Sequence, residues 1–431
     1  MLLRHARRAT ATCLRSLGGG RPAPLYQASR QAMHSEAEAA EADDTDVWGG
    51  GEIPRGAKVY VGMSGGVDSS VTAGLLKDRG YDVEAVFMRN WDTRDERGEC
   101  PSERDFTDVQ AVCRQLDIRC HQVSLVKQYW TAVFSVAIDA YARGLTPNPD
   151  VLCNSEIKFG VLLDHISRKI HGRSCAGGGR DREWWFATGH YARTVRDRSG
   201  DILLYRGSDR RKDQSYYLAA VPSAALDHVV FPLGRLAKKE DVRRMAGEMN
   251  LPTASKEESM GICFVGERRR FDSFLAEYIP QKPGDILASD GRVLGSHRGM
   301  FSRTIGQLAG VSGMHGRWYI YAKEPHTNRM YAVQGRDSPL LMRRTVRAGP
   351  ARWISGSAPP GLGLPGGIAL DVQVRYMQGP QRCTAMALDQ STNTPDGCLN
   401  VEFDAPQFGV AAGQYLVLYS GDRCLGSAMI L

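Results

Sequence analysis

A loop of small residues, Gly62–Ser70, most limits how this chain can fold. It follows Lys58–Met63, an apolar run with the length of a buried strand, and precedes Val71–Arg79, which has helical spacing. Gly65 and Gly66 allow the backbone to turn closely round an anion. Backbone N–H groups and the dipole at the start of the helix favour negative charge there. Strand, glycine loop and helix in this order therefore predict an α/β unit that cradles a phosphate group.

The residues of this loop separate it from other phosphate-binding loops. It lacks the lysine of a Walker A motif and the GxGxxG pattern of dinucleotide folds. Alone it could be an ordinary turn in which Asp68 caps the helix. The whole string SGGVDSS, however, matches the pyrophosphate loop of the N-type ATP pyrophosphatases, which split ATP between its α- and β-phosphates. We therefore expect ATP to be bound through Gly62, Met63, Ser64, Gly65, Gly66, Val67, Asp68 and Ser69.

The alternation of strand and helix continues to about Met260. Apolar runs predict further strands at Val83–Met88, Ile118–Val123 and Trp184–Thr188, and amphipathic spacing predicts helices at Asp105–Leu116, Val126–Arg143 and Ser155–Ile170. Strands that alternate with helices imply a doubly wound parallel sheet with helices on both faces. Residues 172–182 are glycine-rich and charged, which indicates a surface insertion.

The remainder of the chain has a different sequence pattern, with short β-prone runs in place of alternating strands and helices. After one short helix at Phe271–Ile279, brief β-prone runs alternate with Gly, Asp and Pro, and residues 355–366 resemble a second flexible insertion. Short strands at regular spacing predict a small β-rich module and then a β-barrel. The expected organisation is a leader and linker at 1–55, an α/β domain at 56–260, a central β-rich domain at 261–339 and a C-terminal β-barrel at 340–431.

The N-terminal segment has the composition of a mitochondrial transit peptide. Its first 34 residues contain six arginines and no Lys, Asp or Glu, and residues 35–46 then carry six acidic residues and no basic one. The second stretch reads as a solvated linker. We expect targeting to the mitochondrial matrix. No apolar run reaches the roughly 18 residues that span a bilayer, so membrane insertion is not expected. The net charge of +7 suits a polyanionic partner.

Ten cysteines are present, but none is arranged for metal binding. There is no CxxC pair and no Cys/His group with zinc spacing, so no metal site is predicted. In a reducing compartment most of these thiols should be small core residues. The remaining question is whether any of them takes part in chemistry.

Several further motifs identify a resemblance to a known family. They are TPNPDVLCN at Thr146–Asn154, TGHYAR at Thr188–Arg193, KDQS at Lys212–Ser215, GICFVG at Gly261–Gly266, and TIGQ at Thr304–Gln307. Their order and spacing resemble the bacterial and mitochondrial tRNA-specific 2-thiouridylases over roughly residues 57–431. The resemblance implies that ATP with Mg²⁺ adenylates the C2 oxygen of a wobble uridine in tRNAs for Lys, Glu and Gln. Sulfur then replaces the adenylate and leaves 2-thiouridine and AMP.

The same resemblance assigns roles to individual residues. Cys153 would be the nucleophile, Cys263 the persulfide carrier and Asp150 a general acid or base. Cys153 is expected immediately before a helix, whose N-terminus would favour the thiolate. Met88 and Gly189 would complete the ATP site. The residues that would contact the target base or the tRNA are Asn148, Pro149, Asp150, His190, Lys212, Asp213, Gln214, Arg375, Tyr376 and Gln414. A sulfur-donor protein, a cysteine desulfurase or a sulfur relay, is implied as a second partner.

One departure and several rivals stand beside this interpretation. The family usually has basic residues after TIGQ, whereas this chain has Leu308 and Ala309, for which Arg298 or Arg303 could compensate. A 4-thiouridine synthase, a tRNA lysidine synthase or an argininosuccinate synthase would share the ATP loop. The last two need no cysteine, so Cys153 and Cys263 in their motifs argue against them. A catalytically silent tRNA-binding protein would not need an intact SGGVDSS loop.

Overall fold

The computed structural model describes residues 53–92, 101–171, 183–236, 238–257, 271–388 and 397–431. Its N-terminal part is built on a five-stranded parallel sheet in the order β3-β2-β1-β4-β7. The strands are β1 Lys58–Met63, β2 Asp82–Arg89, β3 Arg119–Ser124, β4 Trp184–Thr188 and β7 Val229–Val230. Each of the apolar runs from which strands were predicted here forms one of these strands.

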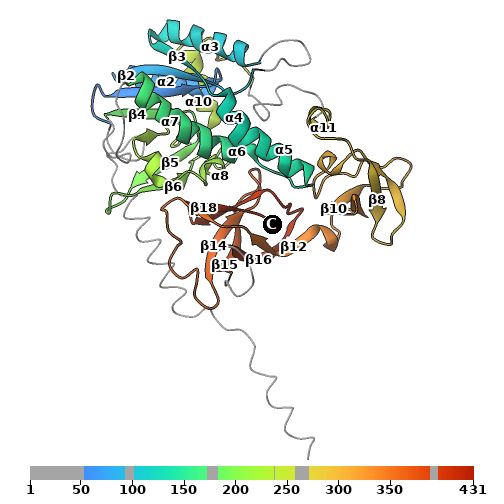
Figure 1. Ribbon diagram of the computed structural model, residues 1–431. Coiled ribbons are helices and arrows are strands. Elements are labelled where there is room, and N and C mark those ends of the chain that lie inside the picture. The colour runs from blue at the N-terminus through green and yellow to red at the C-terminus, as the bar shows by residue number, and fades with distance from the viewer. Residues whose placement is uncertain (1–52, 93–100, 172–182, 237, 258–270, 389–396) are drawn as a thin grey trace, which may run out of the picture.

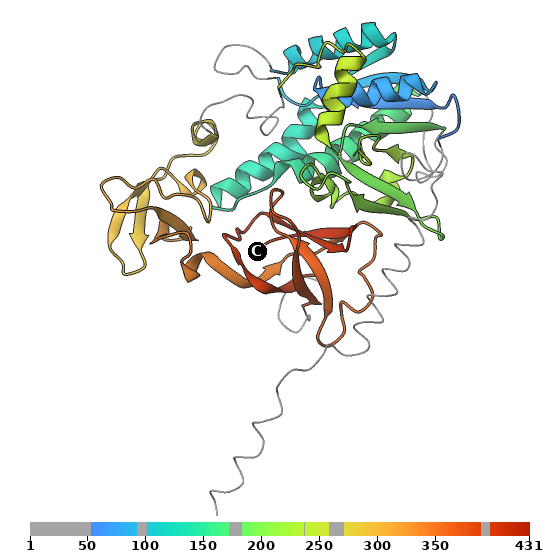
Figure 2. The same cartoon turned by 180° about the vertical axis from the view of Figure 1, so that it is seen from behind.

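Helices cover both faces of this sheet, because alternate residues of each strand point to opposite sides. On one side Val59, Val61 and Phe87 pack with the helices α2, α3 and α10; on the other, Tyr60 and Val86 pack with the long helices that follow β3. Figures 1 and 2 show the two helical layers. The first layer consists of α2 Val67–Asp78, α3 Pro101–Leu116 and α10 Lys239–Glu248. The predicted doubly wound sheet is confirmed.

Two long helical runs form the second layer, and each contains a π-helical stretch. The first is α4 Val126–Tyr129, η1 Trp130–Phe134 and α5 Ser135–Ala142. The second is α6 Pro149–Leu152, η2 Cys153–Val161, α7 Leu162–His165 and η3 Ile166–Ile170. The prediction that this second run begins at Ser155 was wrong: Pro149 occupies the first helical position, where a proline needs no N–H partner. None of the helices within the described ranges is long and apolar enough to cross a membrane.

The central module is a four-stranded sheet in the order β10-β11-β8-β9. Its elements are α11 Phe271–Leu275, β8 Gly284–Ala288, β9 Val293–His297, η5 Met300–Ser302, β10 Trp318–Glu324, β11 Arg329–Gln334 and η6 Pro339–Leu341. Buried Ile286, Leu294, Ile320, Met330 and Ala332 give it a small core of its own. The module lies at one end of the α5 helix in Figure 1.

The C-terminal strands form a strongly curved antiparallel sheet that also takes in two strands from the N-terminal part. Its order is β12-β16-β15-β14-β17-β18-β6-β5, with β13 beside β18. The hairpin of β5 Ala192–Arg196 and β6 Ile202–Arg206 joins this sheet where Cys424 of β18 pairs with Leu204. The remaining strands are β12 Met342–Ala348, β13 Arg352–Trp353, β14 Ile368–Gln373, β15 Gln381–Ala387, β16 Leu399–Phe408, β17 Tyr415–Ser420 and β18 Arg423–Met429.

Two one-turn helices connect the hairpin to the rest of the N-terminal part. They are α8 Ser215–Leu218 and α9 Ser223–Leu226, and Leu218, Val221 and Leu226 are buried in the same core as Val417 and Tyr419 of β17. The Ser215 hydroxyl lies 3.2 Å from the Tyr419 hydroxyl. A single apolar core therefore runs from the parallel sheet into the C-terminal sheet.

Gly234 gives a test of this junction. A Cβ atom there would lie 1.7 Å from the carbonyl oxygen of Ala192 in β5, so the two backbones can approach only because the side chain is absent. Gly234→Ala should lower the free energy of unfolding by about 1–3 kcal/mol or more, because the backbones must separate. Gly247→Ala is the matched control: nothing lies within 4 Å of its Cβ, and alanine in helix α10 should add about 0.5–1 kcal/mol. Urea unfolding of both variants measures this difference, and equal midpoints would contradict the packing.

Candidate functional site

The glycine loop after β1 leaves the start of helix α2 open to an anion. The N-cap is Gly66, which has no side chain to bind the N–H groups of the first turn. Gly65 has φ +78°, and a Cβ atom there would lie 2.6 Å from the Asp105 carbonyl oxygen. Both the left-handed backbone and the close approach require glycine. Local sequence thus fixes a loop that presents N–H groups, as the phosphate-binding prediction expects.

Hydroxyl groups within the loop hold its shape. The hydroxyls of Ser64 and Ser69 lie 3.2 Å apart, and Ser69 Oγ also accepts a hydrogen bond from the Ser64 N–H at 3.2 Å. Ser70 Oγ donates to the Gly66 carbonyl oxygen at 2.8 Å. On the first turn of α2, Asp68 Oδ1 accepts a hydrogen bond from the Tyr191 hydroxyl at 2.9 Å. The loop is therefore ordered by its own side chains and tied to the segment after β4.

The residues expected to bind ATP meet at the carboxyl ends of three neighbouring strands. Gly62 in β1 pairs with Val86 in β2 and with Thr188 in β4. Met88 near the end of β2 and Gly189 after β4 consequently lie at the same edge of the sheet as the loop. Gly189 packs on α2, since a Cβ atom there would be 2.9 Å from Ser69 N. Met88 also packs against the large core, so its packing role is visible.

A basic residue that the sequence analysis missed lies near this loop. Lys256 Nζ is 2.9 Å from Asp105 Oδ1 and 2.5 Å from Asp108 Oδ2, both on helix α3. Asp105 is the residue whose backbone lies against Gly65. The ammonium and two carboxylates thus support the loop from outside. Nothing local in the sequence around Lys256 indicates this interaction, because its partners lie about 150 residues earlier.

The predicted base-binding segment forms the start of helix α6. Asn148 is the N-cap, and its side-chain oxygen accepts a hydrogen bond from the Asp150 N–H at 3.2 Å. Asp150 is half-buried, and burial raises its pKa to about 6, although the positive charge of Lys158 acts in the opposite direction. A carboxyl group with this pKa can give or accept a proton near neutral pH.

Cys153 lies one turn inside this helix and not before it. The expectation that it precedes the helix was wrong, because Pro149 begins the helix four residues earlier. Its side chain is 7% exposed, and its Sγ lies 3.9 Å from Asn90 Nδ2. Asn90 follows β2 and is buried, and its Oδ1 has no hydrogen-bond partner within the described ranges. Asn90 was not recognised from the sequence. Cys263 lies outside the described residues.

His190 links the segment after β4 to Lys158 on the helical run that carries Cys153. Its Nδ1 is 2.7 Å from Thr188 Oγ1, and its Nε2 is 3.3 Å from Lys158 Nζ. Burial, and then the charge of Lys158, hold the pKa of His190 well below its usual range. The ring is therefore neutral, with Nε2 accepting from the ammonium and Nδ1 donating to Thr188. Lys158 also donates to Asn154 Oδ1 at 3.0 Å, one residue after Cys153.

The KDQ segment, Lys212–Gln214, is hydrogen-bonded to the residue that follows His190. Gln214 Oε1 accepts from the Tyr191 N–H at 3.1 Å. The carboxylate of Asp213 is buried and accepts from Arg206 Nε at 2.7 Å and from the Gly207 N–H at 3.0 Å. Asp213 thus stabilises the segment from within, and Lys212 is the half-buried basic member of the segment.

Three of the residues predicted to contact tRNA come from the C-terminal part and lie beside the base-binding segment. Gln414 Nε2 donates to the Thr146 carbonyl oxygen at 2.9 Å. The Tyr376 ring packs on Tyr217 with 4.4 Å between centroids, and Arg375 lies over the Phe408 ring at 5.6 Å. Burial, and then the charge of Arg336, lower the pKa of Arg375. The structure therefore brings residues separated by more than 200 positions into one region.

The TIGQ motif supports the same segment from the central module. Thr304 Oγ1 is 2.7 Å from Thr146 Oγ1. The two residues that replace the usual basic ones differ in environment: Leu308 is half exposed, and Ala309 is buried. Arg303 Nε donates to the Ala309 carbonyl oxygen at 3.3 Å and its Nη1 to the Ser302 carbonyl oxygen at 2.7 Å. Arg303 is thus engaged with the backbone and is a poor substitute for a phosphate-binding residue.

Family models match three consecutive parts of the chain. Residues 57–267 match a domain described as the tRNA methyl transferase HUP domain. Residues 272–334 match the tRNA methyl transferase PRC-barrel domain, and residues 343–430 match the aminomethyltransferase beta-barrel domain.

Curated relatives are similar over nearly their whole length. The tRNA-specific 2-thiouridylase MnmA of Hydrogenovibrio crunogenus is 42% identical over 379 residues, covering 86% of this chain and 93% of the relative. The protein of the same name from Thiobacillus denitrificans is 43% identical over 379 residues, covering 86% and 99%. A solved complex of a 4-thiouridine synthetase with RNA and ATP is 17% identical, covers 52% of this chain and 51% of its own, and aligns with a TM-score of 0.30, too low to add to these matches.

The raised pKa of Asp150 predicts a dependence of stability on pH. A carboxyl group whose pKa is about 6 when folded, against 3.8 ordinarily, takes up a proton on folding, so it lowers stability as pH rises from about 4 to about 6. Asp150→Asn should therefore gain stability relative to the wild type across this window, by on the order of 1–3 kcal/mol, and the gain should stay constant above it. Urea unfolding of both proteins at pH 4.5, 5.5 and about 7 measures it. A difference that does not change with pH would show that the pKa of Asp150 is not raised.

Proposed function

The chain belongs to the tRNA-specific 2-thiouridylase family, and from this premise we propose that it is an ATP-dependent tRNA sulfurtransferase. It would make 2-thiouridine at the wobble uridine of mitochondrial tRNAs for Lys, Glu and Gln, with release of AMP and pyrophosphate. One observation carries the proposal: the Thr188–His190 segment joins the anion-binding loop to the helix that holds Asp150 and Cys153. This segment thereby contacts both α2, at the end of the loop, and the helical run that carries the thiol, which supports a combined ATP and thiol site.

ATP fits the loop between β1 and α2, since the N–H groups at the start of α2 and the hydroxyls of Ser64 and Ser69 are donors suited to a pyrophosphate. When bound, ATP supplies the adenylyl group that turns the uridine C2 oxygen into a good leaving group. Gly189 and Met88 would flank the nucleotide at the same sheet edge. Asp68 offers carboxylate oxygen to the Mg²⁺ that accompanies ATP.

Asp150 is suited to move a proton at the target base. Its pKa of about 6 lets it act near neutral pH, and its N–H is held by the Asn148 side chain. Asn148 and Pro149 share the first turn with it, so a base placed against this turn meets all three. His190 and Lys158 would line the same space. Because the His190 imidazole is neutral, it does not repel the Lys158 ammonium group.

Sulfur transfer needs two thiols, one that carries sulfur as a persulfide and one that releases it. We assign Cys263 as the carrier and Cys153 as the second thiol. Asn90, whose amide is 3.9 Å from Cys153 Sγ, would steady that sulfur. In the release step Cys153 would attack the Cys263 sulfur and break the S–S bond of the persulfide. The outer sulfur would leave to the activated C2 carbon, AMP would depart, and the two cysteines would be joined in a disulfide, which requires their Cα atoms to come within roughly 7 Å. A thiol reductant would then reduce the disulfide, after which a sulfur-donor protein would pass persulfide sulfur to Cys263.

The tRNA would lie across the region where the three parts of the chain meet. Lys212 and Arg375 are suited to binding phosphates and Tyr376 to base stacking. Gln214 and Asp213 would act mainly by holding the Lys212 loop, because their side chains are bound within the protein. Gln414 would position the base-binding segment through its bond to Thr146.

The rival functions make different chemical demands. Another enzyme with the same ATP loop, such as a 4-thiouridine synthase, would make a different product. A silent tRNA-binding protein would release no AMP, although it would keep the RNA surface. Incubation with tRNA, ATP and a sulfide source, followed by nucleoside mass spectrometry, separates the three, and absence of 2-thiouridine from wild-type reactions would overturn the proposal.

The two cysteines should fail at different steps. Cys263→Ser should bind ATP and tRNA but accept no sulfur label from a donor, because serine cannot carry a persulfide. Cys153→Ser should accept the label at Cys263 and not pass it on. Both should make no 2-thiouridine, and the readouts are protein-bound label and nucleoside mass spectrometry. Asp68→Ala is the control for the nucleotide step and should lose AMP release while still accepting label.

Two results would contradict this assignment. If Cys263→Ser retains label and Cys153→Ser loses it, the roles are reversed. If either variant makes 2-thiouridine at the wild-type rate, the two-cysteine mechanism is wrong.

The location in mitochondria rests on the arginine-rich, acid-free leader. A reporter protein fused after residues 1–50 should enter mitochondria, because an arginine-rich leader without acidic residues is typical of mitochondrial transit peptides. The matched control has its six leader arginines replaced by glutamine and should stay in the cytosol. A chain that starts at Ile53 should keep full activity. Cytosolic fluorescence of the unaltered reporter would remove the targeting assignment.

A further inference from the structure

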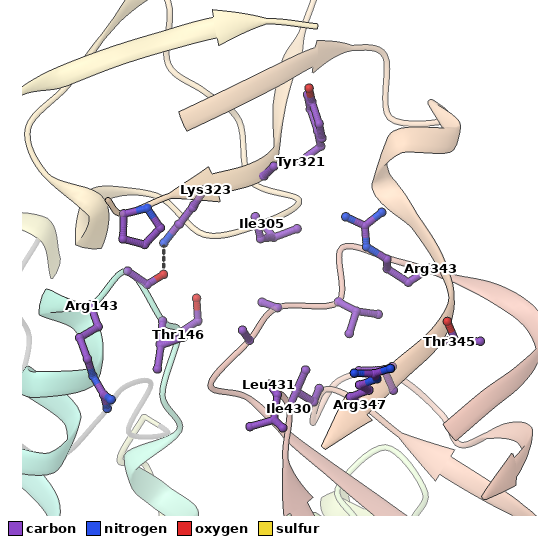
Figure 3. Close-up of a pocket in the computed structure, with 18 residues that line it drawn as sticks. Arg143, Thr146, Ile305, Tyr321, Lys323, Arg343, Thr345, Arg347, Ile430 and Leu431 are labelled. Atoms are coloured by element: carbon purple, nitrogen blue, oxygen red, sulfur yellow. Dashed lines mark hydrogen bonds between the residues drawn. The ribbon is translucent and has the colours of Figure 1, made fainter. Parts of the chain in front are cut away.

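A cavity of about 520 Å³ lies where all three parts of the chain meet. One wall is the Arg143–Thr146 segment at the end of α5, and a second is Tyr321–Pro325 of the central module. The third is β12 together with the last residues of the chain, as Figure 3 shows. None of the residues predicted to bind ATP or tRNA lines it.

The cavity is lined by basic side chains and by no acidic side chain. Arg143, Lys323, Arg343 and Arg347 are among its lining residues, and no Asp or Glu is. In the described part of the chain none of these four forms an ion pair. In Figure 3, Arg343 and Arg347 extend from β12 at one side, whereas the Arg143 guanidinium points away from the centre. Four basic side chains outnumber the α-carboxylate of Leu431, which also lines the cavity, and such an excess of positive charge raises the local concentration of anions.

Lys323 adds a half-buried positive charge to the cavity. Its Nζ donates to the carbonyl oxygens of Gly144 at 3.0 Å and Met300 at 2.8 Å, and burial lowers its pKa to about 8. The neighbouring Glu324 accepts instead from the Tyr331 hydroxyl at 3.0 Å. An ammonium group has three N–H donors, so one remains beyond the two carbonyl bonds. An anion in the cavity would stabilise its charged form.

The cavity also adjoins the segment that carries the proposed catalytic residues. Thr146, one of its lining residues, precedes Asp150 by four positions, and its N–H donates to the Ala412 carbonyl oxygen at 2.8 Å. Apolar Ile305, Val346 and Ile430 form part of the walls and lower the local dielectric. A charge bound here would lie beside the base of the Thr146–Asp150 segment.

We propose that this cavity binds a backbone phosphate of the RNA substrate and so anchors the strand beside the base-binding segment. This inference rests on the proposed function. Arg343 and Arg347 are exposed, so a polymer that crosses the surface can reach both. Guanidinium groups match phosphate oxygens in geometry as well as charge. A free phosphate or a mononucleotide has the same chemistry, and the experiment separates these sources.

The test is the salt dependence of tRNA binding by variants of the full chain. Arg343→Ala and Arg347→Ala should each weaken binding and flatten the slope of log K against log salt by about 0.7–0.9 for each phosphate that is no longer neutralised. Arg344→Ala is the matched control: it is exposed on the same strand, does not line the cavity, and should leave the slope unchanged. Fluorescence anisotropy with labelled tRNA between about 50 and 200 mM KCl gives the slopes.

A second measurement distinguishes the anion source. Inorganic phosphate and AMP are titrated separately into the wild type and Arg343→Ala by calorimetry. Binding of phosphate or AMP at millimolar concentration to the wild type and not to Arg343→Ala, together with unchanged salt slopes for tRNA in both cavity variants, would identify a small-anion site and overturn the RNA assignment. Unchanged salt slopes for tRNA, with no binding of phosphate or AMP that depends on Arg343, would overturn the site altogether. Formation of 2-thiouridine by the wild type is measured in the same preparations. If no 2-thiouridine forms, the proposed function fails. If 2-thiouridine forms normally and the salt slopes of the variants are unchanged, only this inference fails.

Discussion

The arrangement of the site depends on how the short Gly144–Asp150 segment is held. Its carbonyl groups accept hydrogen bonds from Lys323 of the central module and from Gln414 of the C-terminal part, and the Thr146 hydroxyl forms one with the Thr304 hydroxyl. No single one of these bonds is strong, since a net hydrogen bond contributes about 0.5–1.5 kcal/mol. Together they fix where helix α6 begins, and with it the positions of Asp150 and Cys153. The two β-rich parts therefore support the catalytic segment as well as offering surface to RNA.

Burial gives the groups around this segment their chemical character. Partial removal from water raises the pKa of Asp150, and together with Lys158 it keeps His190 neutral. Burial destabilises the charged forms of Asp150 and His190. Keeping these groups buried therefore lowers the free energy of unfolding. Such perturbed groups concentrated beside a phosphate loop are typical of active sites. Their clustering supports the functional assignment independently of sequence similarity.

The parallel sheet was predictable because strands buried on both faces appear as continuous apolar runs, as in Trp184–Thr188. The conformation of the Gly62–Ser70 loop was predictable because its glycines and serines act locally. The start of α6 was not, since Pro149 resembles a loop residue unless its place at the first helical position is known. Asn90 and Lys158 were missed for another reason: each is defined by a partner distant in sequence or by burial, neither of which the local pattern reports.

The hairpin β5–β6 has a consequence for the order in which the chain can fold. Leu204 of β6 pairs with Cys424 of β18, so its edge has no strand partner until about 220 residues later in synthesis. During translation an apolar strand edge, Ile202–Arg206, must remain exposed or covered by a chaperone while the rest of the sheet is made. A chain cut anywhere before β18 should keep that edge open and tend to aggregate. The C-terminal strands thus complete the N-terminal part, and premature termination would be more damaging than loss of a separate domain.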